Sequence, residues 1–424
     1  MPSSGSRPPR PTDQAGQQVV AFFAMRQEGH FDSLLPLVSR LARRGLAPHV
    51  FTHADFRERV ERAGGTFVDL FAKYPLEPAD DESLPAPCRH VSFAGRYAEA
   101  ISRDLEAIQP SLVVYDAHAV IGRVVAVELG IPYVSVCPAH NVSPARLPRL
   151  IETLPAISIS PACERGVEVL QRRYGLTDAS PFAFASWLSP YLNLYGEPAE
   201  YLTEAEQGAM APVAFSGCLP EIDEIESRRG SNGPVYFEPG ESRLKIYVSF
   251  GTVVWRYFPS RAVDAVRTLS DSLAAMGDEV TATISIGGAN VTDEFLDAHQ
   301  HPNVSVLRYV DQWKILGEAD AFVTHNGLKS THEAVFNRVP MISYPFFWDQ
   351  PALAEKCQSL DLAMPLMDSA GVSLQPEDLQ RAIGELASNG NSLQHGLERA
   401  REWELELIAD RGSVLDRIVA LIPS

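Results

Sequence analysis

The chain has 424 residues, 45% of them apolar and 21% charged, which fits a globular protein of two or three domains and excludes a disordered or fibrous one. It has 36 Lys and Arg against 54 Asp and Glu, and the net charge of -18 argues against unassisted binding to nucleic acid or anionic membranes. Five scattered cysteines without a CxxC pair argue against a disulfide framework or a structural zinc site and favour the reducing cytoplasm.

The first residues and the apolar stretches carry no targeting signal. Residues 1–17 are rich in Pro, Ser, Gly and Gln without the apolar core of a signal peptide, so we expect a disordered tail. The longest apolar stretch, residues 119–136, is interrupted by Arg123, Glu128 and Pro132. A spanning helix needs about 20 apolar residues, so we expect a soluble protein without stable membrane anchoring.

The first half alternates short apolar runs with segments of helical periodicity. Strands are predicted at residues 19–24, 48–52, 67–70, 112–115 and 133–136, and helices at 34–45, after a turn at Gly29, and at 56–63, 91–108 and 120–129. Such alternation predicts right-handed βαβ crossovers and a parallel sheet.

The second half repeats this pattern after a segment dense in Pro, Gly, Glu and Arg. Strands are predicted at residues 245–249, 281–286, 304–307, 321–324 and 341–344, and helices at 260–275, 328–336 and 351–358. We therefore expect an α/β protein with two Rossmann-like, doubly wound domains facing across a cleft. The expected divisions are domains at 18–220 and 243–400, a linker at 221–242, and a C-terminal helical segment at 401–424 that packs back on the N-terminal domain. Ligands bind at the carboxyl ends of such strands.

A candidate anion site lies where residues 321–324 run into the following helix. His325 lies at the strand tip, Gly327 at the turn and Ser330 in the first helical turn, where free amides can hold a pyrophosphate. A structural alternative makes Gly327 a turn glycine and Ser330 a cap, with Glu333 completing a capping box.

The residues downstream favour the anion site. From Glu333 the chain continues through Val339-Pro340 to Pro345 and then Asp349-Gln350. This order resembles the family-one, UDP-dependent glycosyltransferases of the GT-B fold, whose signature runs His-x-Gly-x-x-Ser, Glu, Gly-Val-Pro and Pro-x-x-x-Asp-Gln. Residues 308–312 resemble the Trp-x-Pro-Gln start of that signature, and residues 246–252 its opening strand and phosphate-contacting turn.

The resemblance implies a role for each matching residue. Tyr309 would stack on uracil, and Val310 and Gln312 would contact the base edge and ribose. Thr252, beside Gly251, would hold the pyrophosphate together with His325 and Ser330. Glu333 would form hydrogen bonds with the ribose, and Asp349 and Gln350 with the donor sugar. The chain departs from the family pattern at Tyr309, Asp311, Asn326, Lys329 and Arg338. Of these, Lys329 could add positive charge beside the diphosphate.

The N-terminal half supplies a candidate general base. His30 follows the first strand where family members carry Gly-His, and an imidazole with a pKa near 6.5 suits proton removal from a hydroxyl. Asp116, at the end of another strand, matches the carboxylate that orients this base in relatives. In the alternative interpretation, His30 is an ordinary loop or core histidine and Asp116 caps the next helix. His118, two residues after Asp116, is the second candidate for an active-site imidazole.

Other patterns point to no metal and no redox cofactor. His332-Glu333 lacks a second histidine four residues on, Asp80-Asp81 lacks the Asp-x-Asp arrangement of metal-dependent transferases, and there is no GxGxxG. We expect a nucleotide sugar, UDP-glucose before others, as co-substrate, with neither metal nor other cofactor.

These residues together predict an inverting, metal-independent hexosyltransferase of natural-product biosynthesis, a monomer or homodimer. The expected acceptor is an apolar or aromatic small molecule, because aromatic residues populate the loops that should form its pocket, at residues 71–96 and 139–192, or lie just beyond the first loop. These residues are Phe93, Tyr97, Phe182, Phe184, Trp187 and Tyr191. Three alternatives remain open: a dTDP-deoxysugar-dependent transferase, a GT-B nucleotide-sugar 2-epimerase, and a catalytically silent sugar-nucleotide-binding subunit.

Overall fold

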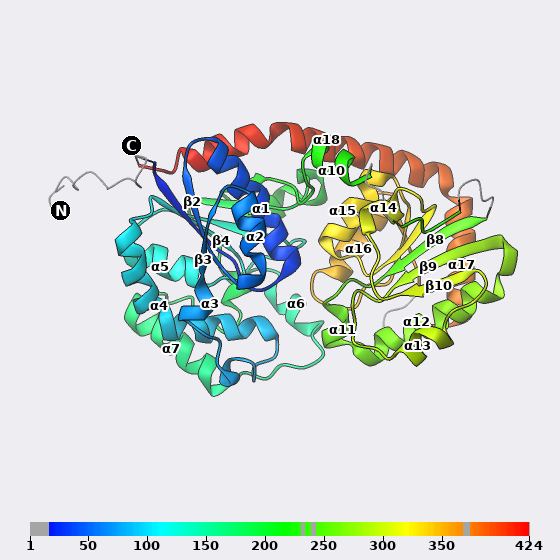
Figure 1. The fold of residues 1–424 in the computed structure, drawn as a ribbon, viewed down its shortest axis with the longest axis horizontal. Helices are drawn as coiled ribbons and strands as arrows, with labels where there is room; N and C mark the ends of the chain where they lie inside the picture. Colours follow the sequence, from blue (N-terminus) through cyan, green and yellow to red (C-terminus); the bar gives the residue numbers. More distant parts are fainter. Residues whose placement is uncertain (1–16, 230–233, 239–242, 368–373, 424) are drawn as a thin grey trace.

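Two parallel sheets, each flanked by helices, form the protein (Figure 1). The computed structural model describes residues 17–229, 234–238, 243–367 and 374–423. The tail expected at residues 1–17 lies outside these ranges except for its last residue. Among the helices described, none is both long and apolar enough to cross a membrane.

The N-terminal sheet has seven strands in the order β3-β2-β1-β4-β5-β6-β7. They are β1 Val19–Phe23, β2 Ala47–Thr52, β3 Thr66–Asp69, β4 Leu112–Asp116, β5 Tyr133–Cys137, β6 Leu192–Tyr195 and β7 Val213–Phe215. The helices are α1 Glu28–Arg43, α2 Arg57–Arg62, α3 Leu70–Lys73, α4 Arg89–Ile108, α5 Ile121–Leu129, α6 Leu147–Glu152, α7 Pro161–Tyr174, α8 Ala183–Ser186 and α9 Glu204–Ala209, with short 3₁₀ turns η1 Ala54–Phe56, η2 Pro78–Asp80, η3 Ala86–Cys88 and η4 Ala199–Tyr201. β1, β4 and β5 are buried along their whole length, because helices cover both faces of the sheet.

The C-terminal sheet repeats the arrangement with six strands in the order β10-β9-β8-β11-β12-β13. They are β8 Leu244–Ser249, β9 Val280–Ser285, β10 Val304–Leu307, β11 Ala321–Thr324, β12 Met341–Ser343 and β13 Ala363–Pro365. The helices are α11 Val254–Tyr257, α12 Pro259–Ala275, α13 Asp293–Ala298, α14 Gln312–Leu316, α15 Leu328–Asn337, α16 Gln350–Ser359 and α17 Pro376–Ser388, with the 3₁₀ turn η5 Gly277–Glu279.

Strand order places a crevice at the same point of each sheet. From β1 the chain crosses over to β2 and β3 on one side of the sheet, and from β4 it crosses over to β5 and β6 on the other side. The loops that follow the neighbouring strands β1 and β4 therefore leave in opposite directions and open a crevice between them. The loops after β8 and β11 diverge in the same way. The expected doubly wound α/β class is confirmed, and each sheet offers one such crevice at its carboxyl edge.

The strands β6, β7 and β13 are missing from the sequence-based prediction, and three predicted segments differ from the structure. The helix placed after a turn at Gly29 begins at Glu28, because Phe31 is fully buried and extends the apolar face by one turn. The segment expected to be a linker contains α10 Ile222–Arg229, and Ile225 packs into the core of the C-terminal domain. The rest of that segment is described only at residues 234–238. The loop expected at residues 139–192 contains α6, α7 and α8.

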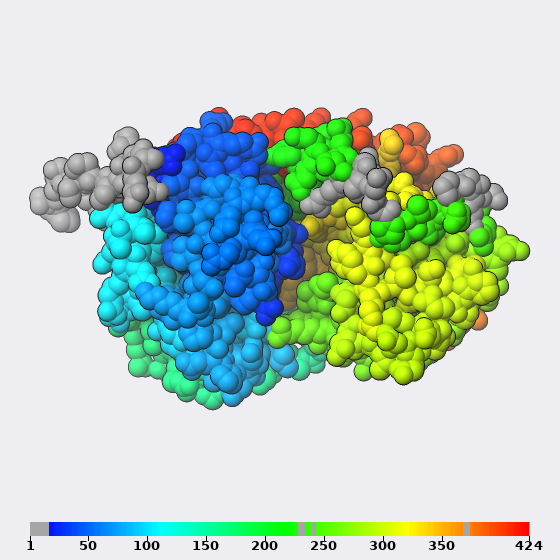
Figure 2. Space-filling view, viewed as in Figure 1, coloured from blue at the N-terminus to red at the C-terminus, as the bar shows by residue number. Residues whose placement is uncertain are grey.

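A single long helix, α18 Gly390–Val419, crosses both domains along one side of the molecule (Figure 1), and its residues form the orange and red band along the top of Figure 2. Leu397 packs in the core of the C-terminal domain, whereas Leu415 and Ile418 pack in that of the N-terminal domain. Between them, the buried guanidinium of Arg411 donates hydrogen bonds to the carbonyls of residues 216, 219 and 220. The division expected at residues 400/401 falls inside this helix.

A buried ionic network also joins the domains. His332 of α15 lies between Glu197, which follows β6, and Glu404 of α18; its Nε2 is 3.0 Å from Glu197 Oε1. His140 approaches the other oxygen of Glu197 at 2.7 Å. Burial alone would lower the pKa of His332, but Glu404 and Glu197 raise it to about 10. His332 is therefore a buried cation between two carboxylates.

We expect His332→Ala to lower the free energy of unfolding by roughly 3–5 kcal/mol, because it leaves two buried carboxylates without their cation. Urea titration followed by circular dichroism measures the change. His395→Ala is the matched control, since the side chain of His395 on α18 is 80% exposed and its loss should change stability by less than about 0.5 kcal/mol. Equal effects from the two substitutions would contradict a stabilising role for the network.

Candidate active site

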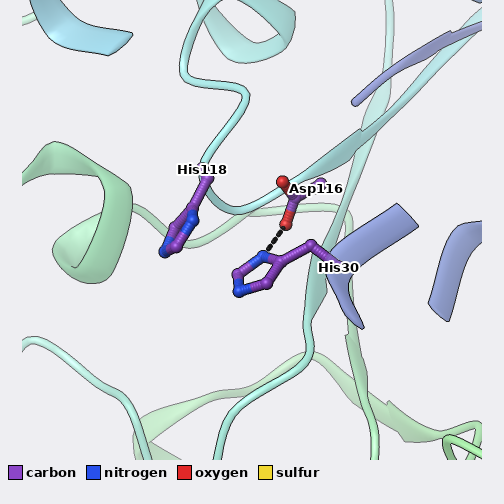
Figure 3. Close-up of side chains that lie close together, drawn as sticks. All are labelled: His30, Asp116 and His118. Atoms are coloured by element: carbon purple, nitrogen blue, oxygen red, sulfur yellow. Dashed lines mark hydrogen bonds and ion pairs between the residues drawn. The ribbon is translucent and has the colours of Figure 1, made fainter. Parts of the chain in front are cut away.

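His30 and Asp116 meet at the crevice of the N-terminal sheet (Figure 3). β1 and β4 are paired neighbours, so the first turn of α1 brings His30 beside the end of β4. His30 Nδ1 lies 2.6 Å from Asp116 Oδ1, and the carboxylate is fully buried. A carboxylate only accepts, so Nδ1 carries the proton and Nε2 keeps its lone pair. Asp116 makes no side-chain cap for α5, whose N-cap is Val120.

His118 forms a second layer behind this pair. Its ring stacks on that of His30 with centroids 3.9 Å apart and planes 27° apart. Its Nδ1 lies 2.7 Å from the side-chain oxygen of Gln27, which fixes the proton on Nδ1. Burial, together with His30, holds the pKa of His118 well below its usual range. His118 is therefore neutral and holds the ring of His30 from one face.

The same three residues, His30, Asp116 and His118, bring their potential ligand atoms within 4.8 Å of one another. Imidazole nitrogens bind a metal through lone pairs in the ring plane. The two stacked rings direct these lone pairs along nearly parallel planes, and Nδ1 of each ring already has a partner. The geometry suits a hydrogen-bonded base better than a shared metal.

The crevice of the C-terminal sheet holds His325. β8 and β11 are paired neighbours, and the loops that follow them carry Gly251 with Thr252, and His325. A Cβ at Gly251 would lie 2.8 Å from the His325 ring, and one at Gly327 only 2.3 Å from it, so both positions require glycine. Burial lowers the pKa of His325 to about 4. At neutral pH this histidine can therefore meet an anion as a neutral donor, not as a cation.

The first turns of α14 and α15 bring three polar side chains together. The Nε2 group of Gln312 donates to Ser330 Oγ at 3.1 Å and to Glu333 Oε2 at 2.6 Å. Ser330 and Glu333 thus converge on Gln312 and do not form the capping box considered above; the N-cap of α15 is Gly327. Nearby, Tyr309 is 78% exposed, whereas Val310 is buried.

Asp349 is the N-cap residue of α16, and Gln350 is the first residue of that helix. Asp349 Oδ2 accepts from the backbone N–H of His140, in the other domain, at 2.9 Å. Burial raises the pKa of Asp349 to about 6, and this N–H opposes the rise. The side-chain oxygen of Gln350 accepts from Phe346 N–H at 2.9 Å, which leaves its NH₂ group to donate. Both domains therefore build this part of the site.

The aromatic residues expected around an acceptor are only partly placed there. Trp187 is buried against the guanidinium of Arg123. Tyr191 lies at the amino edge of the sheet, opposite His30, where its ring contacts Tyr133 at the start of β5. Phe93 is buried in the core. Phe184 does reach the site: its ring lies edge-on to His118 at 5.4 Å and stacks on Trp348 of the other domain at 5.7 Å.

Sequence reasoning did not single out His140, Trp348 or Asp32, which contacts Lys329 across the domain boundary. Trp348 precedes Asp349 and has a left-handed backbone, with φ of +60°, and its N–H donates to Thr153. His140 acts partly through its backbone, which no residue pattern reveals. The position of Trp348 next to a recognised pair was the one available signal.

Comparisons with known proteins agree along the chain. Residues 235–390 match the family described as UDP-glucoronosyl and UDP-glucosyl transferase. An NDP-glycosyltransferase of Bacillus licheniformis is 24% identical over 92% of this chain and 93% of its own. The oleandomycin glycosyltransferase of Streptomyces antibioticus is 26% identical over 96% and 97%. The solved glycotransferase of kitacinnamycin superposes with a TM-score of 0.76 at 23% identity, covering 96% of this chain and 100% of that one.

We expect Gly327→Ala to weaken binding of a nucleoside diphosphate at least tenfold, because the new Cβ would displace the buried His325 ring. Isothermal titration with UDP measures the affinity. Gly384→Ala, in α17 of the same domain with nothing within 4 Å of its Cβ, is the control and should bind as the wild type does. Unchanged affinity in Gly327→Ala would separate His325 from the anion site.

Proposed function

We propose that this chain, a family-one glycosyltransferase with the GT-B fold, moves a hexose from UDP-glucose to a hydroxyl of an apolar or aromatic small molecule, with inversion at the anomeric carbon. The observation that carries the proposal is the contact of 2.6 Å between His30 and Asp116. It lies at the crevice of one sheet, while the family's donor signature lines the crevice of the other.

In the proposed reaction, His30 Nε2 takes the proton of the acceptor hydroxyl. The oxygen then attacks the anomeric carbon as the bond from that carbon to the diphosphate breaks, and UDP leaves. Asp116 stabilises the imidazolium that forms, and the stacked, neutral His118 keeps its ring in place. A single displacement inverts the configuration at that carbon.

The leaving diphosphate would be held without a metal. The free amides at the start of α15, the hydroxyls of Thr252 and Ser330 and the neutral His325 would face the charge that develops on it. Because these dipoles are fixed before the reaction, they need little reorganisation during bond breaking. Chelators should then leave transfer intact.

The donor and acceptor classes follow from the polar and apolar parts of the site. Glu333 can satisfy both ribose hydroxyls of a uridine nucleotide, and Asp349 with Gln350 can satisfy hydroxyls of a complete hexose. Phe184 and Trp348 present apolar rings near His118, which supports an aromatic or apolar acceptor. Relatives named for oleandomycin and kitacinnamycin support a natural product as acceptor.

We expect His30→Ala to lower turnover roughly 10²–10⁴-fold while UDP affinity stays nearly constant, because the imidazole acts on the acceptor. Initial rates with a phenolic acceptor and titration with UDP give the two quantities. Asp116→Asn should lower the rate with the same unchanged affinity.

His118→Phe is the control that separates the two imidazoles, since phenylalanine keeps the stacking and removes the nitrogens. It should retain most of the activity. Near wild-type turnover in His30→Ala, together with loss in His118→Phe, would transfer the role of base to His118.

We expect UDP-glucose to be a better donor than dTDP-glucose, and dTDP-glucose better than a dTDP-6-deoxysugar, because each step leaves one more polar group of the site unpaired. Initial rates with the three donors and one accepted substrate test nucleotide and sugar separately. Preference for the deoxysugar would refute the donor assignment and leave the base assignment untouched. Release of UDP without a glycosylated product would favour the epimerase or the silent subunit.

A further inference from the structure

A chain of ion pairs joins the donor helix to the helix of the candidate base. Lys329 of α15 places its Nζ 2.5 Å from Asp32 Oδ2 on α1. The other oxygen of Asp32 is paired with Arg59 of α2, and Arg59 is also paired with Glu28 at 2.7 Å. Cations and anions therefore alternate across the domain boundary.

Lys329 lies where a donor diphosphate would arrive. It is the second residue of α15, and its own backbone N–H is among the free amides at that helix start. Its ammonium is also 4.0 Å from Glu333 Oε1. Asp32, its partner, lies two residues beyond His30 on α1. One ammonium thus lies between the proposed anion site and the helix that carries the base.

The contact is accessible and has room to rearrange. The side chains of Lys329 and Asp32 are 33% and 24% exposed. Both line a cavity of about 310 Å³, which is also lined by Arg43, Arg59 and Arg62. A four-carbon lysine stem can turn within such a space without moving the backbone.

A bound diphosphate would compete with Asp32 for this ammonium. The diphosphate brings more negative charge than one carboxylate and would be anchored beside Lys329 by the amides of α15. Asp32 would not be left uncompensated, because Arg59 remains paired with it. The exchange therefore replaces one ion pair by another and leaves no isolated charge.

We infer that Lys329 is a donor-binding residue that exchanges Asp32 for the donor diphosphate, so that Asp32 weakens nucleotide binding and favours release of UDP. This inference rests on the proposed function. Relatives usually carry asparagine at this position, and an amide cannot form the ion pair with Asp32. The exchange would thus distinguish this chain from the family pattern.

Titration with UDP tests the exchange in four full-length proteins: the wild type, Lys329→Met, Asp32→Asn and the double variant. We expect Lys329→Met to weaken binding about tenfold and Asp32→Asn to tighten it about threefold to tenfold, because Asp32 no longer competes with the diphosphate for the ammonium. In the double variant, Asp32→Asn should have no further effect on the affinity of Lys329→Met. Tighter binding cannot result from a damaged fold, so the Asp32 variant is decisive.

Lys73→Met is the matched control, because it breaks a Lys–Asp pair of the same length, to Asp104, on the surface of the N-terminal domain. It should leave UDP affinity unchanged. If UDP binds and Asp32→Asn has wild-type or weaker affinity, the exchange is refuted while the proposed function stands. If neither UDP nor dTDP binds to the wild type, the proposed function and the exchange both fail.

Discussion

A buried histidine cation between two carboxylates holds helix α15 in place. His332 on α15 contacts Glu197 from one domain and Glu404 from α18, and none of the three is more than 1% exposed. The first turn of the same helix presents Ser330 and Lys329 to the cleft. Since breaking a buried ion pair is costly, the network fixes the first turns of α15 relative to the other domain.

Histidine takes different states in this protein according to its partners. His332 stays charged because carboxylates face both nitrogens. His325 is buried and His118 is half-buried, and no carboxylate of the described residues is hydrogen-bonded to either ring, so desolvation keeps both neutral. His30 combines a buried carboxylate on one nitrogen with partial exposure of its side chain. This combination lets an imidazole take up a proton and have the resulting charge stabilised.

Sequence patterns predicted the central strands of both sheets but missed β6 and β7 at one end of the N-terminal sheet and β13 at the edge of the C-terminal sheet. The runs at β1, β4, β8 and β11 are short, continuous and apolar, and their ends carry the residues that the structure brings together at the two crevices. The predicted start of α1 was wrong because a glycine in a sequence suggests a turn, whereas Gly29 lies in the first turn of the helix. Likewise, aromatic composition could not distinguish Tyr191, at the far edge of the sheet, from Phe184, beside His118.

The sequence by itself determined the alternating elements, the doubly wound class and the motifs at the strand ends, because periodicity and turn chemistry act between residues close in the chain. Only the tertiary structure decided which distant side chains meet. Three contacts join segments more than one hundred residues apart: Lys329 with Asp32, His332 with Glu197, and the N–H of His140 with Asp349. Such contacts depend on how the two sheets face each other, and no local pattern encodes that orientation.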